Sequence, residues 1–325
     1  MRFSFSEEQL AFAGSVRDYL EKTCPSDAVR KAADGDADGA RERWRGLADL
    51  GVLGVVLPEQ QGGLGLDEVD LVLALEEAGY ACLPEPVGPT YVAASALQDG
   101  GATTWLSRVA GGEAVLAIGL GGPVAGEPDA DAFVMADGDD LYLVPGADAE
   151  IEPLPSLDPT QPLSGVKWTP KANALLTGAS VEAARDRGAF AASAELVGVA
   201  RRCVELAAQH ARDRQQFGRP IGSFQAVTHL LANAHLAVEF ARPVVYRAAW
   251  SLANDVAERS RDASMAKAMA SDAAVTACRA ALQVHGAIGY TEEHDLHLWL
   301  KRGFALASMW GDAARHRERV ARAIL

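Results

Sequence analysis

Long segments with helical periodicity fill the C-terminal part of this sequence and constrain its fold more than any other feature. Four of them, rich in Ala, Leu and Val, lie at roughly residues 189–213, 223–257, 262–285 and 293–324. The breaks between them are short: FGRPIGS, a polar stretch near Arg259, and HGAIGYT. Long helices joined by short connections favour an antiparallel four-helix bundle.

The residues before this bundle divide into two parts of different character. Between Ser6 and about Gly112, helical patterns alternate with Gly and Pro, and Ser6 and Gln9 have the spacing of a capping box that opens the first helix. After Gly112, the short apolar runs AVLAIGL, AFVMADGDDLYLV, SGVKW and NALLTG are separated by Gly, Pro and Asp, which is typical of strands and turns. We therefore predict a mainly α protein with an N-terminal helical domain at 1–112, a small β domain at 113–185 and the C-terminal four-helix bundle at 186–325.

Composition and charge exclude several classes of function. With 49% apolar and 23% charged residues the chain is a typical globular protein, and no apolar run approaches the length of a membrane span. The first residues, MRFSFSEEQL, lack the pattern of a secretory signal, so we expect a cytoplasmic protein. A formal net charge of −14 argues against a nucleic-acid partner. The four cysteines lack any spacing typical of zinc, redox or disulfide sites, so we expect reduced core cysteines and no metal site.

The first informative segment is the break ARDRQQFGRPIGSFQ, where the chain is expected to turn tightly. The preceding helix ends by Gly218, and Pro220 prevents its continuation. Ser223 can then cap the next helix. The residues between the two helices are therefore expected to form one compact corner.

Two arginines and an aromatic ring meet at this corner. Arg214 and Arg219 flank Phe217 in the sequence. Guanidinium groups beside a helix N-terminus suit a pyrophosphate, and an aromatic face suits the ring attached to it. Composition alone favours a simpler alternative, a bundle corner with solvated arginines.

The second informative segment is the break QVHGAIGYTEEHD. Gly286 and Gly289 allow the backbone to approach a ligand closely and to expose N–H groups for an anion, while Gln283 adds an amide. Thr291 can cap the last helix. Taken alone, the segment is more typical of a plain turn between helices, and His285 is more typical of a structural histidine than of a catalytic one.

Together the two segments resemble the C-terminal domain of the flavin-dependent acyl-CoA dehydrogenases. In that family an Arg-x-x-Phe-Gly-[Arg/Lys]-Pro-Ile corner and a Gln-x-[His/Phe]-Gly-[Gly/Ala]-x-Gly turn hold the diphosphate and adenosine half of FAD across a subunit boundary. The resemblance extends to the N-terminal SEEQ and PEQQGGLG segments. It implies an acyl-CoA substrate, FAD as cofactor, and an electron-transfer flavoprotein or a similar protein as electron acceptor. The FAD-binding residues that it implies are Arg214, Phe217, Phe224, Gln225, Gln283, Val284, His285, Gly286 and Ala287.

The resemblance fails at the catalytic base. Oxidation of an acyl thioester to its enoyl form needs a carboxylate that removes the α-proton while a hydride passes to the flavin. The family places this glutamate before a glycine near the C-terminus, and the matching pair here is Trp310-Gly311. Tryptophan cannot accept a proton. Other members carry the base on the helix after the Phe-Gln corner, where only Asp255 and Glu258 lie near the matched position, and solvated charges at a helix end explain both.

The predicted β domain also departs from the family. Members cradle the flavin ring with a Thr-Glu-x-x-Ala-Gly-Ser-Asp-like segment and a later Lys-x-Trp-Ile-Thr-Asn-like strand. Here 120–128 stands in the first place, and 165–170 is either a remnant of the second or an edge strand ended by proline. We therefore expect the chain's own flavin site to be eroded and the two corners that it would lend to a neighbour to be intact.

This asymmetry favours a subunit that completes the FAD site of a homologous catalytic partner. The family includes α2β2 enzymes, notably those of actinobacterial steroid side-chain breakdown, in which a degenerate subunit pairs with a catalytic one. We therefore expect a subunit of an FAD-dependent acyl-CoA dehydrogenase in an α2β2 complex. One alternative is a self-sufficient homo-oligomeric dehydrogenase with Asp255 or Glu258 as base, and the other is a non-enzymatic helical scaffold without flavin.

Overall fold

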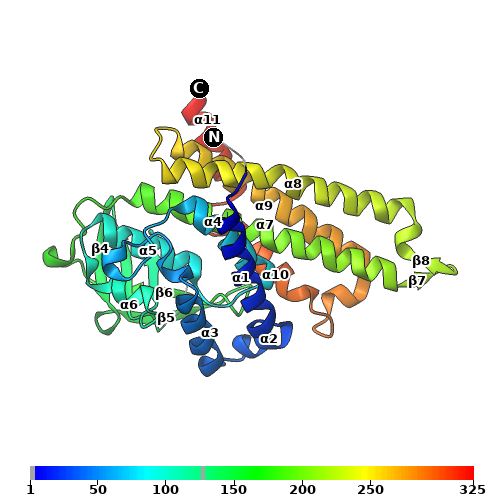
Figure 1. Cartoon of the computed structure of the whole chain (residues 1–325), viewed down its shortest axis with the longest axis horizontal. Helices are drawn as coiled ribbons and strands as arrows, with labels where there is room; N and C mark the ends of the chain where they lie inside the picture. The colour runs from blue at the N-terminus through cyan, green and yellow to red at the C-terminus, as the bar shows by residue number, and fades with distance from the viewer. Residues whose placement is uncertain (1–3, 126–128) are drawn as a thin grey trace. The chain divides into compact units, whose positions relative to one another are not determined.

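The chain folds into two compact units, seen in a computed structural model that describes residues 4–125 and 129–325 (Figure 1). One unit contains Ser6–Ala74 and Pro84–Gly188, and the other contains Met1–Phe5, Leu75–Leu83 and Ala189–Leu325. The N-terminal helices and the sheet therefore pack into one unit. The boundaries of the three domains drawn from the sequence stay a prediction.

Helices make up most of the first unit before its sheet. Ser6 caps the first of them, because its hydroxyl accepts from Gln9 N–H while the Gln9 side chain accepts from Ser6 N–H. The predicted capping box is thus confirmed. The helices are α1 (Glu7–Thr23), α2 (Ser26–Ala33), α3 (Ala37–Asp49), the start of α4 (Glu68–Ala81), α5 (Val87–Asp99) and α6 (Leu106–Ala110).

A six-stranded sheet follows these helices, in the order β4-β3-β1-β2-β6-β5. Only β1 and β3 run parallel, and the other neighbours are antiparallel. Phe133, Met135 and Val144 are buried together against one face. The strands are β1 (Leu116–Gly119), β2 (Val124–Ala125), β3 (Ala132–Asp137), β4 (Asp140–Pro145), β5 (Glu150–Leu154) and β6 (Leu163–Lys167).

Two predictions about the strands are wrong. The run NALLTG is no strand, because a 3-10 turn at Ala172–Ala174 takes its first two residues and Leu175 forms only a single bridge to Tyr142. The segment 150–154 is a strand that was not predicted. Its sequence, EIEPL, contains two acids and a proline, which an edge strand tolerates because one side of it faces solvent.

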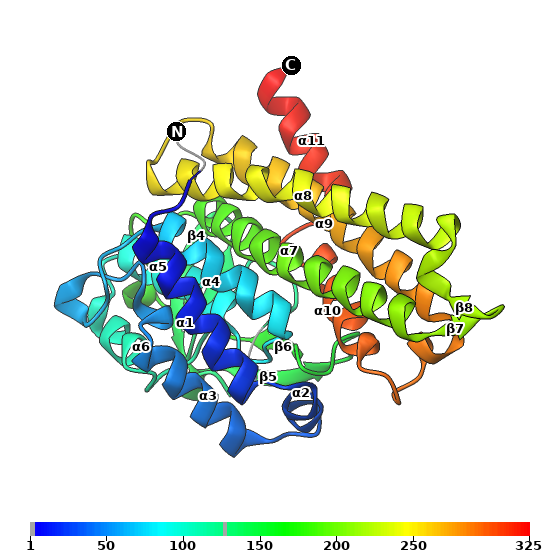
Figure 2. The ribbon, with the colours of Figure 1, turned by 45° about the vertical axis from the view of Figure 1, so that its right-hand side comes forward.

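Long helices dominate the second unit, as predicted, and with the small sheet they confirm the mainly α fold class (Figures 1 and 2). They are α7 (Val181–Asp213), α8 (Gln225–Ala253), α9 (Arg259–His285), α10 (Leu296–Ser308) and α11 (Ala313–Ile324). The single last helix predicted at 293–324 is wrong. Met309 is extended, and Trp310 (φ 61°) and Gly311 (φ 104°) have left-handed backbone, which ends α10 and starts α11 in a new direction.

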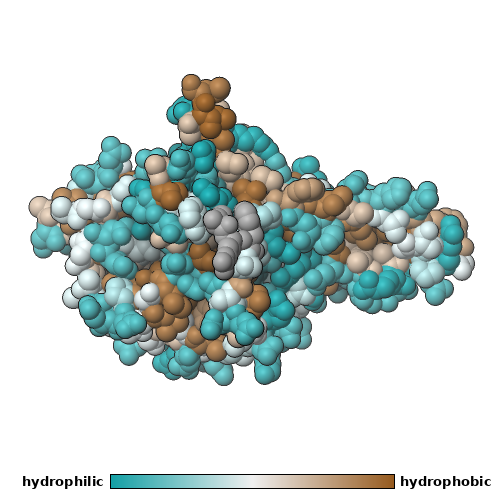
Figure 3. Space-filling view, turned by 45° about the horizontal axis from the view of Figure 1, so that its top comes forward, coloured by the Kyte–Doolittle hydropathy of each residue, from teal (hydrophilic) through white to brown (hydrophobic). Residues whose placement is uncertain are grey.

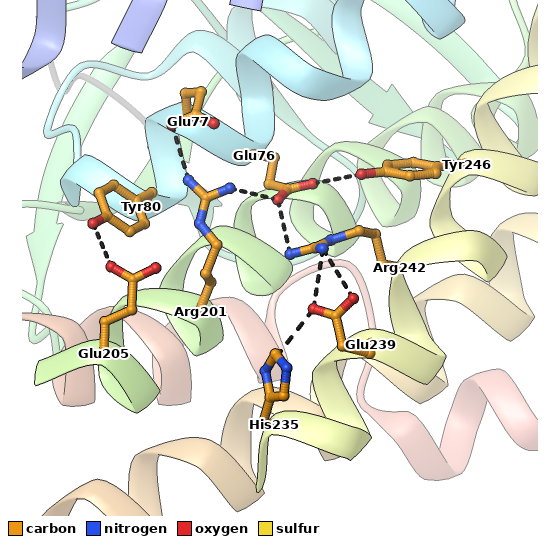
Figure 4. A network of polar contacts seen from close by, with 9 residues as sticks. All are labelled: Glu76, Glu77, Tyr80, Arg201, Glu205, His235, Glu239, Arg242 and Tyr246. Carbon is orange, nitrogen blue, oxygen red and sulfur yellow. Dashed lines mark hydrogen bonds and ion pairs between the residues drawn. The ribbon is translucent and has the colours of Figure 1, made fainter. Parts of the chain in front are cut away.

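The end of α4 crosses α7 at close range within this unit. A Cβ on Gly198 would lie 1.9 Å from Glu76 O, and one on Gly79 would lie 2.0 Å from Glu195 O, so only glycine permits this approach. Figure 4 shows the polar network beside the crossing, in which Glu76 accepts hydrogen bonds from Arg201 (2.8 Å) and Tyr246 (3.0 Å). Burial raises the pKa of Glu76, and the charges of Arg242 and Arg201 oppose that rise.

The four cysteines are buried and free, as predicted. Cys203 and Cys278 lie 3.8 Å apart in the core of the bundle, and burial together with the contact between them raises the pKa of Cys203. Among the described residues, no helix combines the length and the apolar character needed to cross a bilayer.

Replacing Glu195 with glutamine should flatten the dependence of stability on pH. Burial raises the pKa of this carboxyl from 4.5 to about 7, although the charge of Arg302 acts in the opposite direction. The folded state therefore binds the proton more tightly than the unfolded state, and stability is lost as the pH rises through this window. Between about pH 5.5 and about pH 8 this group should lower the free energy of unfolding by roughly 2 kcal/mol.

Urea unfolding across this pH range measures the effect. Glu195→Gln should lose that component of the slope, whereas Glu205→Gln, which changes an exposed residue of the same helix, should keep it. Equal slopes for the wild type and Glu195→Gln would contradict the assignment.

Candidate functional site

The corner between α7 and α8 is a tight hairpin. Two-residue strands, β7 (Gln215–Gln216) and β8 (Arg219–Pro220), pair antiparallel. Phe217 (φ 52°) and Gly218 (φ 75°) form the turn with left-handed backbone, the geometry that suits a two-residue hairpin. Helix α7 thus ends at Asp213, earlier than Gly218.

Aromatic and cationic side chains gather on this hairpin as predicted from their order in the sequence. The rings of Phe217 and Phe224 meet edge to face at 6.0 Å, and the Arg219 guanidinium lies 4.3 Å above the Phe224 ring. Phe217 is 91% exposed, and Arg214 and Gln225 are exposed as well. An aromatic ring held in water at a strained backbone position is well placed to contact another molecule.

The predicted helix cap at this corner is wrong. Ser223 does not cap α8, because its hydroxyl donates to Pro220 O at 2.7 Å. Phe224 occupies the cap position and makes no side-chain capping bond.

The second bend begins where α9 ends at His285. Gly286 has φ 65° and ψ −139°, a backbone conformation that is nearly restricted to glycine, and a Cβ there would meet open space. Gln283, Gly286 and Ala287 are exposed, whereas Val284 and His285 are buried. This bend therefore presents backbone and one amide to solvent.

Two details of the second bend differ from expectation. Gly289 is buried, and a Cβ there would lie 3.0 Å from both His285 Cβ and Leu282 Cδ1, so packing rather than ligand approach requires glycine. Thr291 does not cap the next helix, because α10 begins only at Leu296 with Asp295 before it.

The two bends lie at the same end of the bundle (Figures 1 and 2). His210, in the last turn of α7, stacks on His285 with ring centroids 4.3 Å apart, and His285 lies 4.5 Å from the ring of His294. Burial lowers the pKa of His285 to about 4, and the two neighbouring imidazoles act in the same direction. Burial also lowers the pKa of His210. The rings of His210 and His285 are therefore neutral at pH 7.

Trp310 lies in the irregular turn between α10 and α11, and the buried Lys267 of α9 fixes that turn. The Lys267 ammonium donates to Ala307 O (3.0 Å), Gly311 O (3.0 Å) and Ser271 Oγ (3.1 Å). Burial lowers the pKa of Lys267 to about 7, against the charge of Asp312. These bonds hold the backbone of the turn, and the Trp310 indole offers no carboxylate.

The two other candidates for a catalytic base lie in water. Helix α8 ends at Ala253, before Asp255, whereas the sequence predicted a helix to 257. The side chain of Asp255 is 83% exposed and pairs with Arg259 at 2.7 Å, and Glu258 is exposed. A base that abstracts a carbon-bound proton needs a site shielded from water, which neither position provides in this chain.

The sheet carries a cleft of about 590 Å³ that the sequence did not reveal. Its lining joins β4, at one edge of the sheet, to the residues after β6, and the Tyr142 and Trp168 rings meet at 5.5 Å. The sheet therefore curls until distant strands approach. Because β6 lies between β2 and β5, 165–170 is not an edge strand, and Trp168 and Thr169 line the cleft. In the segment 120–128, residues 126–128 lie outside the described residues.

Sequence reasoning missed Tyr142, Lys267 and the pair His210 and His294. None of them belongs to a spaced motif, and each meets its partners only through contacts between distant segments. The one available signal was that His210, His285 and His294 each lie near the end of a predicted helix.

Comparisons with known proteins agree with this architecture. The model of the acyl-CoA dehydrogenase N-terminal domain matches residues 6–113, and the model of the C-terminal domain matches residues 179–325. Acyl-CoA dehydrogenase IpdE2 of Mycolicibacterium smegmatis is 34% identical over 94% of this chain and 95% of its own length. Acyl-CoA dehydrogenase FadE34 of Mycobacterium tuberculosis is also 34% identical, over 97% of this chain but only 48% of its own length.

The fold comparison gives the same result. A chain in a solved variant of the Tcur3481-Tcur3483 steroid ACAD superposes with a TM-score of 0.85 and 26% identity, covering 98% of both chains. The two family models together match most of the chain, and IpdE2 matches nearly all of it. Both comparisons therefore give the same classification. The chain belongs to the acyl-CoA dehydrogenase family of FAD-dependent oxidoreductases.

Proposed function

We propose that this chain is a subunit of an FAD-dependent acyl-CoA dehydrogenase that completes the FAD site of a homologous catalytic partner, in an α2β2 complex. The observation that carries the proposal is the contrast between two parts of the chain. The hairpin and the α9 bend expose six of the nine predicted FAD contacts, whereas the position of the usual catalytic glutamate holds Trp310.

The exposed residues at the end of the bundle suit the dinucleotide half of FAD. The guanidinium of Arg214 is exposed and can pair with a diphosphate. Gly286 N–H donates to Leu282 O, but the absence of a side chain at Gly286 leaves open space in which a cofactor can approach the backbone of the bend. Phe217 offers a flat face in solvent. FAD, when bound, supplies the hydride acceptor for α,β-dehydrogenation of an acyl-CoA thioester. This chain's contribution would be to bind and orient the cofactor's tail.

An exposed apolar stripe on the bundle supports assembly with a second subunit. Leu236 and Phe240 are one turn apart on α8 and are 52% and 66% exposed. Ile324 and Leu325 are exposed at the end of α11. Figure 3 shows brown patches among the hydrophilic surface of the C-terminal helices. Apolar side chains that share one helix face are commonly covered in an oligomer.

The relatives support the proposed partner and substrate class. The name of the Tcur3481-Tcur3483 steroid ACAD joins two proteins, which supports a dehydrogenase built from two different subunits. We extend from this to a homologous catalytic partner, an acyl-CoA substrate, and an electron-transfer flavoprotein or similar acceptor, with the complex in the cytoplasm.

Counting flavin per chain in the purified complex tests the proposal. The chain should co-purify with a homologous dehydrogenase encoded in the same genome, and the complex should hold one FAD per two chains. One FAD per chain would contradict the proposal and favour the self-sufficient homo-oligomer. A complex without flavin absorbance would also contradict it and favour the non-enzymatic helical scaffold.

Two variants separate the first two outcomes further. Glu258→Gln and Asp255→Asn should leave turnover of the complex unchanged, because both side chains lie in water. Loss of turnover in either variant would identify a base in this chain and overturn the proposal.

A further inference from the structure

Three histidines from three separate segments converge beside the corner hairpin. His210 lies in the last turn of α7, His285 is the last residue of α9, and His294 lies in the irregular connection that precedes α10. One ring nitrogen from each lies within 4.8 Å of the others. Their positions along the chain form no recognisable metal-binding motif, and only the fold brings them together.

His285 has the arrangement of a prepared metal ligand. Its Nδ1–H donates to Ala281 O at 2.8 Å, which fixes the tautomer and leaves the lone pair on Nε2. That Nε2 is buried and has no hydrogen-bond partner among the described residues. A buried acceptor without a partner is unfavourable, whereas a backbone carbonyl behind one ring nitrogen is the usual support of a metal-bound histidine.

The other two histidines give the site access to solvent. His210 and His294 are half-buried, so an ion can enter from their side. Leu296 N–H donates to Nδ1 of His294 at 3.1 Å, and a metal ion bound at that nitrogen would compete with this hydrogen bond. The charged neighbours of His210 are Asp213 and Arg214, which have opposite signs.

The donor set selects the class of ion. Three imidazoles without a carboxylate suit Zn²⁺ and related transition-metal ions, whereas Mg²⁺ and Ca²⁺ require oxygen ligands. Tetrahedral coordination at Zn–N distances of about 2.0 Å brings ligand nitrogens to roughly 3.4 Å from one another. Because the present separation is up to 4.8 Å, the nitrogens must approach by up to about 1.4 Å. His294 can supply part of this movement because it lies in an irregular connection, and the half-buried His210 ring must turn out of its stack on His285 so that its lone pair points at the ion.

We infer that His210, His285 and His294 form a binding site for one Zn²⁺-like ion, with a fourth coordination position open to water or to an external ligand. The site would join the ends of α7, α9 and the connection to α10. It would thereby stiffen the end of the bundle that carries the corner hairpin.

Zinc binding to the full-length chain without a polyhistidine tag tests this inference. The chain is stripped of metal, and Zn²⁺ alone is added in competition with a coloured chelator. We expect about one Zn²⁺ per chain, a rise in the thermal unfolding midpoint on addition of Zn²⁺, and no such rise with Mg²⁺. Substitution with Co²⁺ should give the intense visible absorption of a tetrahedral site.

Variants of the two half-buried ligands keep the test independent of core packing. His294→Asn and His210→Asn should each weaken zinc affinity at least about tenfold, while His235→Asn, on the exposed face of α8, should not. Absence of stoichiometric zinc, or unchanged affinity in the double variant His210→Asn, His294→Asn, would overturn the inference. These readouts do not involve flavin, so they are separate from the test of the proposed function.

Discussion

Glu85→Gln should lower the free energy of unfolding by about 3 kcal/mol, because it leaves the Arg43 guanidinium charged and buried without its counter-ion. In the unit that contains the sheet, Arg43 Nε donates to Glu85 Oε1 at 2.8 Å. The two side chains are only 5% and 4% exposed. Burial opposes the charge of Arg43, but the hydrogen bond and charge of Glu85 leave its pKa raised. Removing one partner of this pair should therefore cost far more than breaking a surface ion pair.

Urea unfolding monitored by circular dichroism measures this loss, and two further variants serve as controls. Asp38→Asn removes the carboxylate of an exposed ion pair with Arg41 and should leave the unfolding midpoint unchanged. The double variant Arg43→Met, Glu85→Met removes both charges and should be more stable than Glu85→Gln alone. If Glu85→Gln were as stable as the wild type, Arg43 would have to be solvated rather than buried.

Arg214→Ala should weaken FAD retention by the proposed complex roughly 10- to 100-fold, since a charge-assisted bond to phosphate contributes about 1.5–3 kcal/mol. Arg214 follows the last residue of α7 and is exposed, so its loss should not disturb the core of the chain. Equilibrium dialysis of the complex, followed by flavin absorbance, measures the change directly.

A neighbouring arginine supplies the control for this variant. Arg212→Ala removes an exposed positive charge in the last turn of the same helix and should leave FAD retention near the wild-type value. Equal retention by the wild type and Arg214→Ala would remove Arg214 from the cofactor site. Equal losses in both variants would indicate a general effect of charge rather than a specific contact.

Local patterns predicted the helical parts of this protein well. The capping box at Ser6 and Gln9 depends on residues three apart, and the helical periodicity of α7, α8 and α9 repeats within each segment. Sequence order also predicted a tight corner at Gly218 and Pro220, although not its two short strands or the end of α7 at Asp213. Where the prediction failed, at Ser223, Thr291 and the break near Trp310, competing local bonds or tertiary contacts determined the conformation.

Local sequence also identified the family through two short segments, although it could not assign the chemistry of every residue in them. Gly286 has a backbone conformation that nearly requires glycine, whereas a Cβ on Gly289 would crowd His285 and Leu282 at 3.0 Å. Glycine thus satisfies a backbone constraint at Gly286 and a packing constraint at Gly289. Only the three-dimensional neighbours distinguish them.

The amino-acid sequence by itself determined most of the helices, their order, the mainly α class and the two segments that relate this chain to a flavin-dependent family. Only the tertiary structure decided that the sheet curls until Tyr142 meets Trp168, that Lys267 fixes the turn at Trp310, and that three histidines share one site. The physical reason is the difference in sequence separation over which the two kinds of interaction act. Backbone preferences and capping act within a few residues, whereas burial, ion pairing and ligand geometry depend on which distant segments the fold brings into contact.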